Sequence, residues 1–178
     1  MLNKDWLDSF KEKYDIWLLS ARKHLEKENW KEGFKDYPFI NNESAPIALF
    51  KKELKDSKIA LISTAGFYIK NKQIPFNSDD YEGDYSYKEI PSSTSFSSLG
   101  IAHNHYDKKY ALSDPNVVYP VERLKELENE GFIKSLYDTL FSIQGYIPQI
   151  HNFLRTSAID ITTKLTKSDV DAVLLVPV

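Results

Sequence analysis

The sequence predicts an α/β fold, with a mainly parallel, Rossmann-like sheet sandwiched by helices and an N-terminal helical extension. Continuous apolar runs at 58–63 and 170–178 fit strands buried on both faces, and amphipathic helical segments alternate with the strands. A content of 42% hydrophobic and 28% charged residues in a chain of 178 is typical of a globular protein with a real core. We therefore expect a single domain over 1–178, in which 1–56 supplies helices that pack on the sheet and 57–178 forms the sheet itself.

The N-terminal extension predicts two helices. Between residues 2 and 28, aromatic and aliphatic side chains recur every three or four positions and fall on one stripe, which is typical of a packing surface. Gly33 and the polar stretch after it end this helix. Ser44 is a suitable N-cap for a second helix over 45–56, with Pro46 in its first turn.

The rest of the sequence alternates strands and helices. Pro120 begins a helix that Gly131 closes, and these residue types are typical of those two positions. The segment 67–83 predicts a long loop, which in a compact domain is more often functional than idle. The other expected elements are strands at 58–63, 85–90 and 99–103, a helical continuation over 132–140, a strand or buried turn at 141–145, a helix over 147–167 and a final buried strand at 170–178.

The composition excludes several classes of function. The formal net charge is −3 and acidic residues interleave the basic clusters, so no nucleic-acid surface is expected. No apolar run approaches the roughly 20 residues that span a bilayer. The N-terminus lacks the apolar core of a signal peptide, so we expect a cytoplasmic protein. The absence of cysteine excludes a disulfide, a thiolate metal site and a thiol nucleophile within these residues.

The pair His103 and His105 is a candidate for chemistry. If the strand at 99–103 runs on, both side chains point to the same face. Two histidines at this spacing can hold a metal ion with Asp107 or Asp114 as a third ligand, orient a carboxylate substrate, or exchange protons near neutral pH. The structural alternative is two histidines at a strand end that bond to backbone carbonyls. The spacing alone leaves these alternatives open.

Other candidates follow the predicted strands. Thr64-Ala65-Gly66 lets the backbone approach a ligand closely, but it lacks the glycine spacing and the Lys-Ser/Thr end of a phosphate loop. Asp114 and Asn116 flank a proline and have the chemistry of a turn as well as that of a ligand site. Asp84 follows a glycine, where a simple turn is again the alternative.

Six short motifs occur in an order that is typical of one known family. They are KIALISTAGFYIK, GDYSYKEIP, IAHNHYD, DPNVVYPVERLKELENEGFI, FSIQGY and VDAVLLVPV. With these motifs, roughly residues 45 to 178 resemble the amino-terminal, pre-cysteine part of the selenoprotein B family of glycine, betaine, sarcosine and D-proline reductases. Lys88 stands where the family usually has arginine, which would weaken bidentate recognition of an anion at that position.

The resemblance implies reductive cleavage of a carbon–nitrogen bond in a small amino acid or amine. In the family the nucleophile is a cysteine or selenocysteine just past the last strand, and it works with a partner subunit that carries a pyruvoyl group. The resemblance thus implies no cofactor or metal held by this chain itself, and it is compatible with an oligomer. It favours His103 and His105 as the catalytic residues. The residues that we expect to bind the substrate are Thr64, Gly66, Asp84, Asp107, Asp114 and Asn116.

In the family, a reactive residue follows the position of Val178. We expect the natural gene to carry an in-frame UGA, or a cysteine codon, at this point, and we expect these 178 residues alone to have no reductase activity. One rival is a cysteine-less paralogue that binds a ligand or docks to a partner without turnover. Another is a hydrolase that holds a metal ion with the two histidines and an aspartate. One pocket is expected to contain Thr64 to Gly66, His103, His105 and Val178, with Asp114 and Asn116 on its rim and 67–83 as a lid.

Overall fold

The computed structural model describes residues 4–40 and 48–178 of the chain. The chain divides into two compact units, residues 1–50 and 51–178. Each unit is described by itself, so the packing of the N-terminal helices on the sheet stays a prediction. In the described part of the chain, no helix is both long enough and apolar enough to cross a membrane.

The first unit consists of a long helix, α1 (Lys4–Leu25), and a short one, α2 (Trp30–Gly33). Helix α1 confirms the first predicted helix, but it ends at Leu25, and Gly33 lies in α2 instead of ending α1. The indole N–H of Trp17 donates to the carbonyl of Gly33 at 2.9 Å, and a side chain at Gly33 would overlap that of Leu25. Glycine therefore permits the close approach of the two helices. The buried stripe of α1 consists of Leu7, Phe10, Tyr14, Trp17, Ala21 and Leu25.

The second predicted helix is wrong over the part that the structure describes. Residues 48–53 are irregular, and a single 3-10 turn, η1 (Leu54–Asp56), precedes the first strand. Leu49 is 81% exposed, so this segment lacks the buried apolar face that holds most helices in place. The predicted start of this helix, with Ser44 and Pro46, lies outside the described residues.

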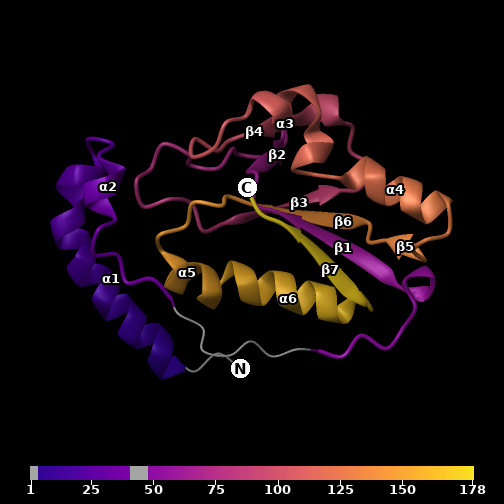
Figure 1. The fold of residues 1–178 in the computed structure, drawn as a ribbon, viewed down its shortest axis with the longest axis horizontal. Helices are drawn as coiled ribbons and strands as arrows, with labels where there is room; N and C mark the ends of the chain where they lie inside the picture. Colours follow the sequence, from indigo (N-terminus) through magenta and orange to yellow (C-terminus); the bar gives the residue numbers. More distant parts are fainter. Residues whose placement is uncertain (1–3, 41–47) are drawn as a thin grey trace. The chain divides into compact units, whose positions relative to one another are not determined.

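The second unit is built on a sheet of five strands, with a separate antiparallel pair beside it (Figure 1). Its strands are β1 (Lys58–Ser63), β2 (Phe67–Ile69), β3 (Tyr87–Pro91), β4 (Leu99–Ile101), β5 (Ser135–Leu136), β6 (Thr139–Ile143) and β7 (Ala172–Val176). On one side β1 pairs in parallel with β5 and then β6, and on the other side it pairs in parallel with β7. Strand β3 is antiparallel to β6, and β2 and β4 form the separate pair. This arrangement confirms the predicted α/β fold.

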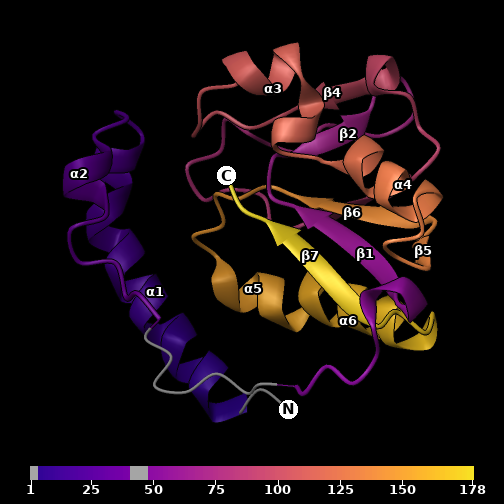
Figure 2. The ribbon, with the colours of Figure 1, turned by 45° about the vertical axis from the view of Figure 1, so that its right-hand side comes forward.

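Helices cover both faces of the sheet, as the predicted sandwich requires (Figures 1 and 2). Leu61 of β1 packs in one apolar cluster with Leu124 of α4 (Val121–Asn129). Ala60 packs in another with Ile161 of α6 (Ser157–Lys167). Because neighbouring side chains of a strand point to opposite faces, α4 and α6 lie on opposite sides of the sheet. The remaining helical elements are η2 (Phe96–Ser98), α3 (Lys109–Ser113), η3 (Pro115–Val117) and α5 (Ile150–Arg155).

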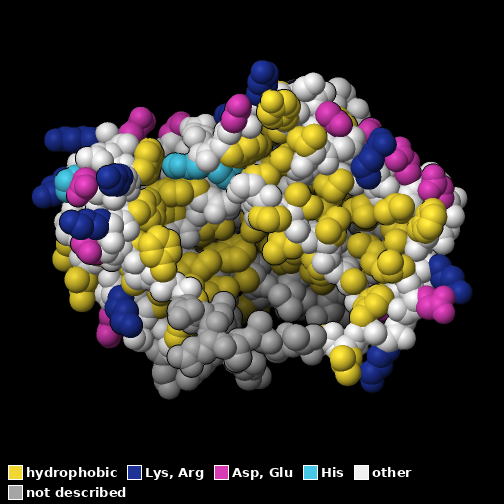
Figure 3. Space-filling view, in the orientation of Figure 1, with side chains coloured by type: hydrophobic (Ala, Val, Ile, Leu, Met, Phe, Trp, Pro, Cys, Tyr) yellow, Lys and Arg dark blue, Asp and Glu magenta, His cyan; other side chains and the backbone are white. Residues whose placement is uncertain are grey.

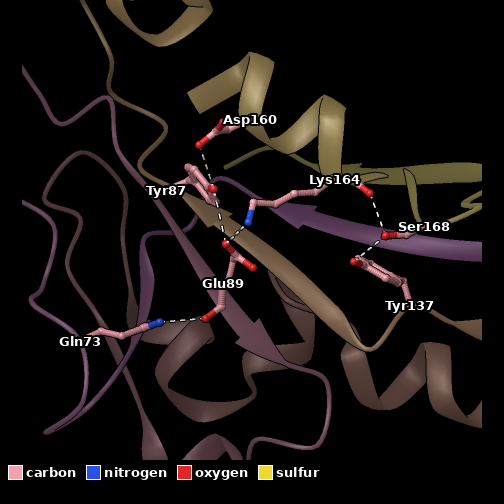
Figure 4. A network of polar contacts seen from close by, with 7 residues as sticks. All are labelled: Gln73, Tyr87, Glu89, Tyr137, Asp160, Lys164 and Ser168. Carbon is pink, nitrogen blue, oxygen red and sulfur yellow. Dashed lines mark hydrogen bonds and ion pairs between the residues drawn. The ribbon is translucent and has the colours of Figure 1, made fainter. Parts of the chain in front are cut away.

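Polar contacts connect α6 to the outer strand β3 (Figure 4). Lys164 Nζ lies 2.9 Å from Glu89 Oε1. The Tyr87 hydroxyl lies 3.4 Å from carboxylate oxygens of both Glu89 and Asp160, and the Gln73 amide donates to the Glu89 carbonyl at 2.8 Å. Ion pairs at a protein surface contribute little to stability. The apolar face of α6 therefore does most to hold this helix on the sheet.

The chain after α4 is extended, so the predicted helical continuation over 132–140 is wrong. Gly131 closes α4 as predicted, with a φ of 75°. The side chains of Ile133 and Leu136 are buried in the same cluster as those of α4, and β5 begins between them. Tertiary burial thus outweighs the helical pattern of this segment.

Three other elements differ in extent from the prediction. The segment 67–83 is not entirely a loop, because β2 occupies its start. The strand predicted at 99–103 ends at Ile101, as β4. The helix predicted over 147–167 is divided at Thr156, whose φ of −124° and ψ of −87° are not helical, into α5 and α6.

The last strand, β7, is an edge strand, so the prediction of a buried strand is wrong. Val173, Leu174 and Leu175 are 43, 40 and 58% exposed. Hydrophobic side chains accordingly gather on the face of the molecule over β7 (Figure 3). A continuous apolar run usually marks a strand with a neighbour on each side and helices on both faces. Among the described residues, β7 pairs with β1 alone.

Candidate functional site

The ends of three parallel strands meet on one edge of the sheet (Figure 2). Thr64 directly follows β1, Gly145 follows β6 by two residues, and Val178 follows β7 by two residues. The Thr64 hydroxyl accepts a hydrogen bond from the main-chain N–H of Val178 at 2.9 Å. Ligands of open α/β sheets bind beyond the carboxyl ends of the strands, so this edge is the candidate site.

Gly66 brings a fourth segment to the same edge. Its N–H donates to the carbonyl of Ile143 at 3.1 Å, and its carbonyl accepts from the N–H of Ala102 at 2.9 Å. Its φ is 73°, and a Cβ at this position would lie 2.6 Å from the Ala102 carbonyl oxygen. Both the conformation and the close approach require glycine. The contact with Ala102 places the next residue, His103, beside the strand ends.

His103 is held as a buried, neutral imidazole. Its side chain is 2% exposed, and its Nδ1 accepts a hydrogen bond from the main-chain N–H of His105 at 3.1 Å. Burial, together with the nearby charges of His105 and Lys108, lowers the pKa of His103 from 6.5 to about 4. With Nδ1 acting as an acceptor, the proton of the neutral ring is on Nε2. Among the described residues, this buried Nε2 has no hydrogen-bond partner.

Gly145 is a site residue that the sequence analysis missed. A Cβ built on it would lie 3.2 Å from His103 Nε2 and 3.2 Å from Thr64 Oγ1. The residue itself is exposed. Gly145 therefore packs closely against the imidazole of His103 and the hydroxyl of Thr64, and a side chain at this position would crowd both. The signal in the sequence is a glycine close to the end of a buried strand, which is a common place for another part of the molecule or a ligand to approach the backbone.

His105 has a different environment from His103. Its ring stacks on Tyr146 with 3.8 Å between the centroids and 18° between the planes, and the residue is exposed. Burial of part of the ring lowers the pKa of His105. The two imidazoles lie 5.9 Å apart at an angle of 73°. No three His, Cys, Asp or Glu side chains are grouped so that they could hold a metal ion, within the part of the chain that the structure describes.

Asp84 anchors one end of the predicted lid beside the strand ends. Its N–H donates to Gln144 Oε1 at 2.9 Å, and its carboxylate accepts from the N–H groups of Asn77 and Ser86 at 2.9 and 2.8 Å. Burial acts to raise the pKa of Asp84, but hydrogen bonds from Ser86 and Asn77, with the charge of Lys88, outweigh it and lower the pKa. Asp84 is thus an ionised anchor of the loop.

Gln144 is the second residue that the sequence analysis missed. It is fully buried, and its Oε1 is occupied by Asp84 while its Nε2 has no partner among the described residues. The same loop is attached further along, because Tyr146 donates to the carbonyl of Tyr81 at 2.7 Å and Asn104 donates to Asp79 at 2.7 Å. The loop thus lies beside the segments that carry the histidines and Gly145, and its closure over a ligand stays a prediction.

Asp107, Asp114 and Asn116 have local structural roles. Asp107 accepts from the N–H of Lys109 at 2.9 Å, and Asp114 accepts from the N–H of Asn116 at 2.9 Å. The Asn116 side chain accepts from the main-chain N–H of Glu122 at 3.2 Å and donates to the Glu122 carboxylate at 3.0 Å. Asp114 is the N-cap of the short helix η3, and the other contacts join residues that are close together in the chain. The structure does not hydrogen-bond any of the three to Thr64, His103 or Gly145, so a role in substrate binding stays a prediction for them.

An open α/β sheet with polar groups at the ends of its parallel strands has the architecture of the Rossmann-like class, in which ligands bind at that edge of the sheet. The chain belongs to the glycine/sarcosine/betaine reductase selenoprotein B family, whose family model matches residues 20–178. This match confirms the family that the order of the motifs predicts.

The relatives of the chain are subunits of reductases. It is 33% identical to the D-proline reductase subunit gamma of Acetoanaerobium sticklandii over 124 residues. This aligned stretch covers 70% of this chain and 50% of that protein. It is 32% identical to the glycine reductase complex component B subunit gamma of Symbiobacterium thermophilum over 142 residues. This aligned stretch covers 79% of this chain and 33% of that protein. The chain thus spans half or less of the length of these relatives. No solved structure matches it.

Proposed function

We propose that this chain is the substrate-binding part of a reductase that cleaves a carbon–nitrogen bond in a small amino acid or amine. The observation that carries the proposal is the meeting of three strand ends around one buried imidazole. Gly145 lies against both the Nε2 edge of His103 and the hydroxyl of Thr64, and Val178 is hydrogen-bonded to that hydroxyl. A small polar ligand suits this arrangement, and the sequence lacks the glycine-rich phosphate loop that many nucleotide-binding proteins use.

Within this proposal, His105 is the residue that exchanges protons. It is exposed, it stacks on Tyr146, and it lies close to the buried His103. Histidine is the side chain whose ordinary pKa lies near neutrality, so it suits a general acid or base. The ring of His103 is shielded from water and is less suited to exchange protons with it.

The nucleophile and the electrons come from outside these residues. The chain has no cysteine, so no thiol in it can attack a substrate or form a disulfide. We propose that a cysteine or selenocysteine elsewhere supplies the reactive atom, that a partner subunit supplies the pyruvoyl group, and that the complex works in the cytoplasm. The relatives of the chain, which are subunits of glycine and D-proline reductases, support a partner subunit.

Binding of substrate candidates by the 178-residue chain tests the proposal. Glycine, sarcosine, betaine and D-proline are each titrated into the 15N-labelled chain, and the amide signals of Thr64, His103 and Gly145 are followed. We expect at least one of the four compounds to shift these signals in a saturable way, with L-glutamate as a bulky control that does not. If all four leave the strand-end signals unchanged, the chain is not the substrate-binding part of the reductase. The cysteine-less docking protein would then be the better description.

A further inference from the structure

The exposed side chain of His105 rests on the ring of Tyr146. The two rings are stacked, with 3.8 Å between their centroids and 18° between their planes. An exposed side chain ordinarily samples several rotamers, and a stacked aromatic neighbour favours one of them. The stack uses the face of the imidazole, whereas the bonds of its two nitrogens lie in the plane of the ring. Tyr146 therefore orients His105 without occupying the atoms that exchange protons.

Tyr146 is itself held by the loop of residues 77–84, which overlaps the end of the predicted lid. Its hydroxyl donates to the main-chain carbonyl of Tyr81 at 2.7 Å. Gly83 lies against its main chain, since a Cβ on this glycine would lie 2.3 Å from the Tyr146 carbonyl oxygen. The φ of Gly83 is 72°, so both the conformation and the close approach require glycine. The loop thus holds Tyr146 at its hydroxyl and at its backbone.

The loop is braced by its own hydrogen bonds. One oxygen of the Asp80 carboxylate accepts from the N–H of Glu82 at 2.9 Å, and the other accepts from the Asn77 amide at 3.1 Å. The Asp80 carbonyl accepts from the N–H of Gly83 at 2.9 Å, and the Asp84 carboxylate accepts from the N–H of Asn77 at 2.9 Å. Turns closed by aspartate side chains in this way have a defined backbone. A displacement at one point of this loop is therefore passed to the residues that contact Tyr146.

The same loop is bonded to the chain on the other side of His105. The amide of Asn104, the residue before His105, donates to the Asp79 carboxylate at 2.7 Å and to the Ser78 carbonyl at 3.3 Å. The Asn104 Oδ1 accepts from Lys108 Nζ at 3.3 Å, so an acidic and a basic group both contact this amide. One loop thus contacts the residue that precedes His105 and the ring that stacks on it.

We propose that Tyr146 is a positioning residue for His105, and that the loop 77–84 sets the orientation of the imidazole through it. The inference rests on the proposed function only in taking His105 as the residue that exchanges protons. A general acid or base acts when its ring is directed at the reacting atom, and a ring that is oriented in advance loses less entropy in the reaction. Tyr146 acts through His105, and the loop acts through Tyr146.

The rotamer of His105 tests this inference in the 178-residue protein without ligand. Three-bond couplings between the Hα and Hβ protons report whether a side chain occupies one rotamer or several. They are measured at about pH 8, where an ordinary histidine is neutral. We expect a single rotamer of His105, together with nuclear Overhauser effects between its ring protons and those of Tyr146. Couplings averaged over several rotamers in the unchanged protein would overturn the inference without recourse to any variant.

Two substitutions at Tyr146 test the stack. Tyr146→Phe keeps the aromatic face, and we expect His105 to keep its single rotamer. Tyr146→Leu removes that face, and we expect the couplings of His105 to become averaged. If His105 keeps one rotamer in Tyr146→Leu, or loses it in Tyr146→Phe as fully as in Tyr146→Leu, the stack does not orient the imidazole and the inference is overturned.

A pair of glycines tests the role of the loop. Gly83→Ala places a methyl group against the Tyr146 carbonyl and should move the loop away, so we expect averaged couplings at His105. Gly131→Ala is the matched control, because its φ of 75° is similar but a Cβ there meets nothing within 4 Å. We expect it to leave His105 unchanged. Equal couplings in the two variants would overturn the role of the loop, and circular dichroism identifies a variant that is misfolded.

The outcomes separate this inference from the proposed function. If His105 behaves as expected while glycine, sarcosine, betaine and D-proline all leave the strand-end signals unchanged, Tyr146 positions His105 and the proposed function fails. If one of these compounds binds while His105 samples several rotamers in the unchanged protein, the proposed function stands and the inference fails.

Discussion

The hydroxyl of Ser63 donates to the main-chain carbonyl of Val118 at 2.7 Å, and both groups are buried. The same oxygen accepts from the N–H of Ala65 at 3.2 Å. The last residue of β1 is thereby tied to the chain just before α4. This link fixes the turn that contains Thr64 and so determines where its hydroxyl lies.

The first prediction concerns this link. Ser63→Ala removes the partner of two buried main-chain groups, and we expect it to reduce the free energy of unfolding by about 1–3 kcal/mol. Urea unfolding followed by circular dichroism measures the change. Ser95→Ala, at an exposed position, is the control and should stay within about 0.5 kcal/mol of the unchanged protein. Equal effects of the two substitutions would contradict the structural role of Ser63.

The second prediction compares two glycines that share a positive φ. Gly66 and Gly131 have φ values of 73° and 75°, but a Cβ at Gly66 would lie 2.6 Å from the Ala102 carbonyl oxygen whereas one at Gly131 meets nothing within 4 Å. Gly131→Ala should therefore reduce the free energy of unfolding only by the backbone strain, about 1 kcal/mol. Gly66→Ala adds a steric clash, and we expect it to reduce the free energy of unfolding by roughly 2–4 kcal/mol. Thermal and urea unfolding of both variants check the difference, and similar costs would show that the close approach at Gly66 can relax.

The third prediction is a dependence of stability on pH. Burial holds the pKa of His103 at about 4 in the folded protein, against 6.5 for an ordinary histidine. Above pH 6.5 the ring is neutral in both states and its contribution is constant. As the pH falls from about 6.5 to about 4 the unfolded chain takes up the proton first, so stability decreases, by up to about 3 kcal/mol. Below pH 4 both states are protonated and the loss from this group levels off.

His103→Gln removes the titrating imidazole, so the variant is compared with the unchanged protein. Urea midpoints are measured between about pH 4 and about pH 7.5 for both proteins, and the difference between them isolates His103 from the other titrating groups. His105, whose pKa is also lowered by burial, is present in both proteins. Parallel curves for the two proteins would mean that His103 is accessible to protons in the folded state.

The fourth prediction concerns activity. The chain contains no cysteine, and a hydroxyl cannot replace a thiol or selenol in a two-electron reduction. Incubation of the 178-residue protein with a dithiol and glycine, betaine, sarcosine or D-proline should give only the rate seen without protein. Turnover that depends on the protein would contradict the mechanism implied by the family.

The sequence predicts the fold best where local and tertiary signals agree. The apolar run of β1 and the proline and glycine that bound α4 are examples, and the structure has both elements close to the predicted positions. The helix predicted over 132–140 is wrong because the helical pattern of this segment competes with the burial of Ile133 and Leu136. That burial depends on distant parts of the chain. Strand β2 has only three residues, which is too short for a period to be seen.

The site is predicted in part. The strand-end rule identifies Thr64 and Gly66 from the sequence, and the histidine spacing identifies His103 and His105. The histidine spacing cannot show that the ring of His103 is buried and that of His105 exposed. This difference depends on how the chain after β4 crosses the strand ends. Gly145 is missed for a similar reason, since its importance comes from the atoms that approach it. The codon after Val178 stays a prediction that sequencing of the gene would test.

The exposed edge of β7 has a consequence for how the protein behaves at high concentration. Three neighbouring aliphatic residues, Val173 to Leu175, lie at the surface of a strand whose outer edge pairs with no other strand among the described residues. Unprotected edges of this kind promote intermolecular sheet formation, and natural proteins often block them with a lysine. The purified chain should thus be prone to aggregation, and Leu174→Lys should raise its solubility while the fold is kept.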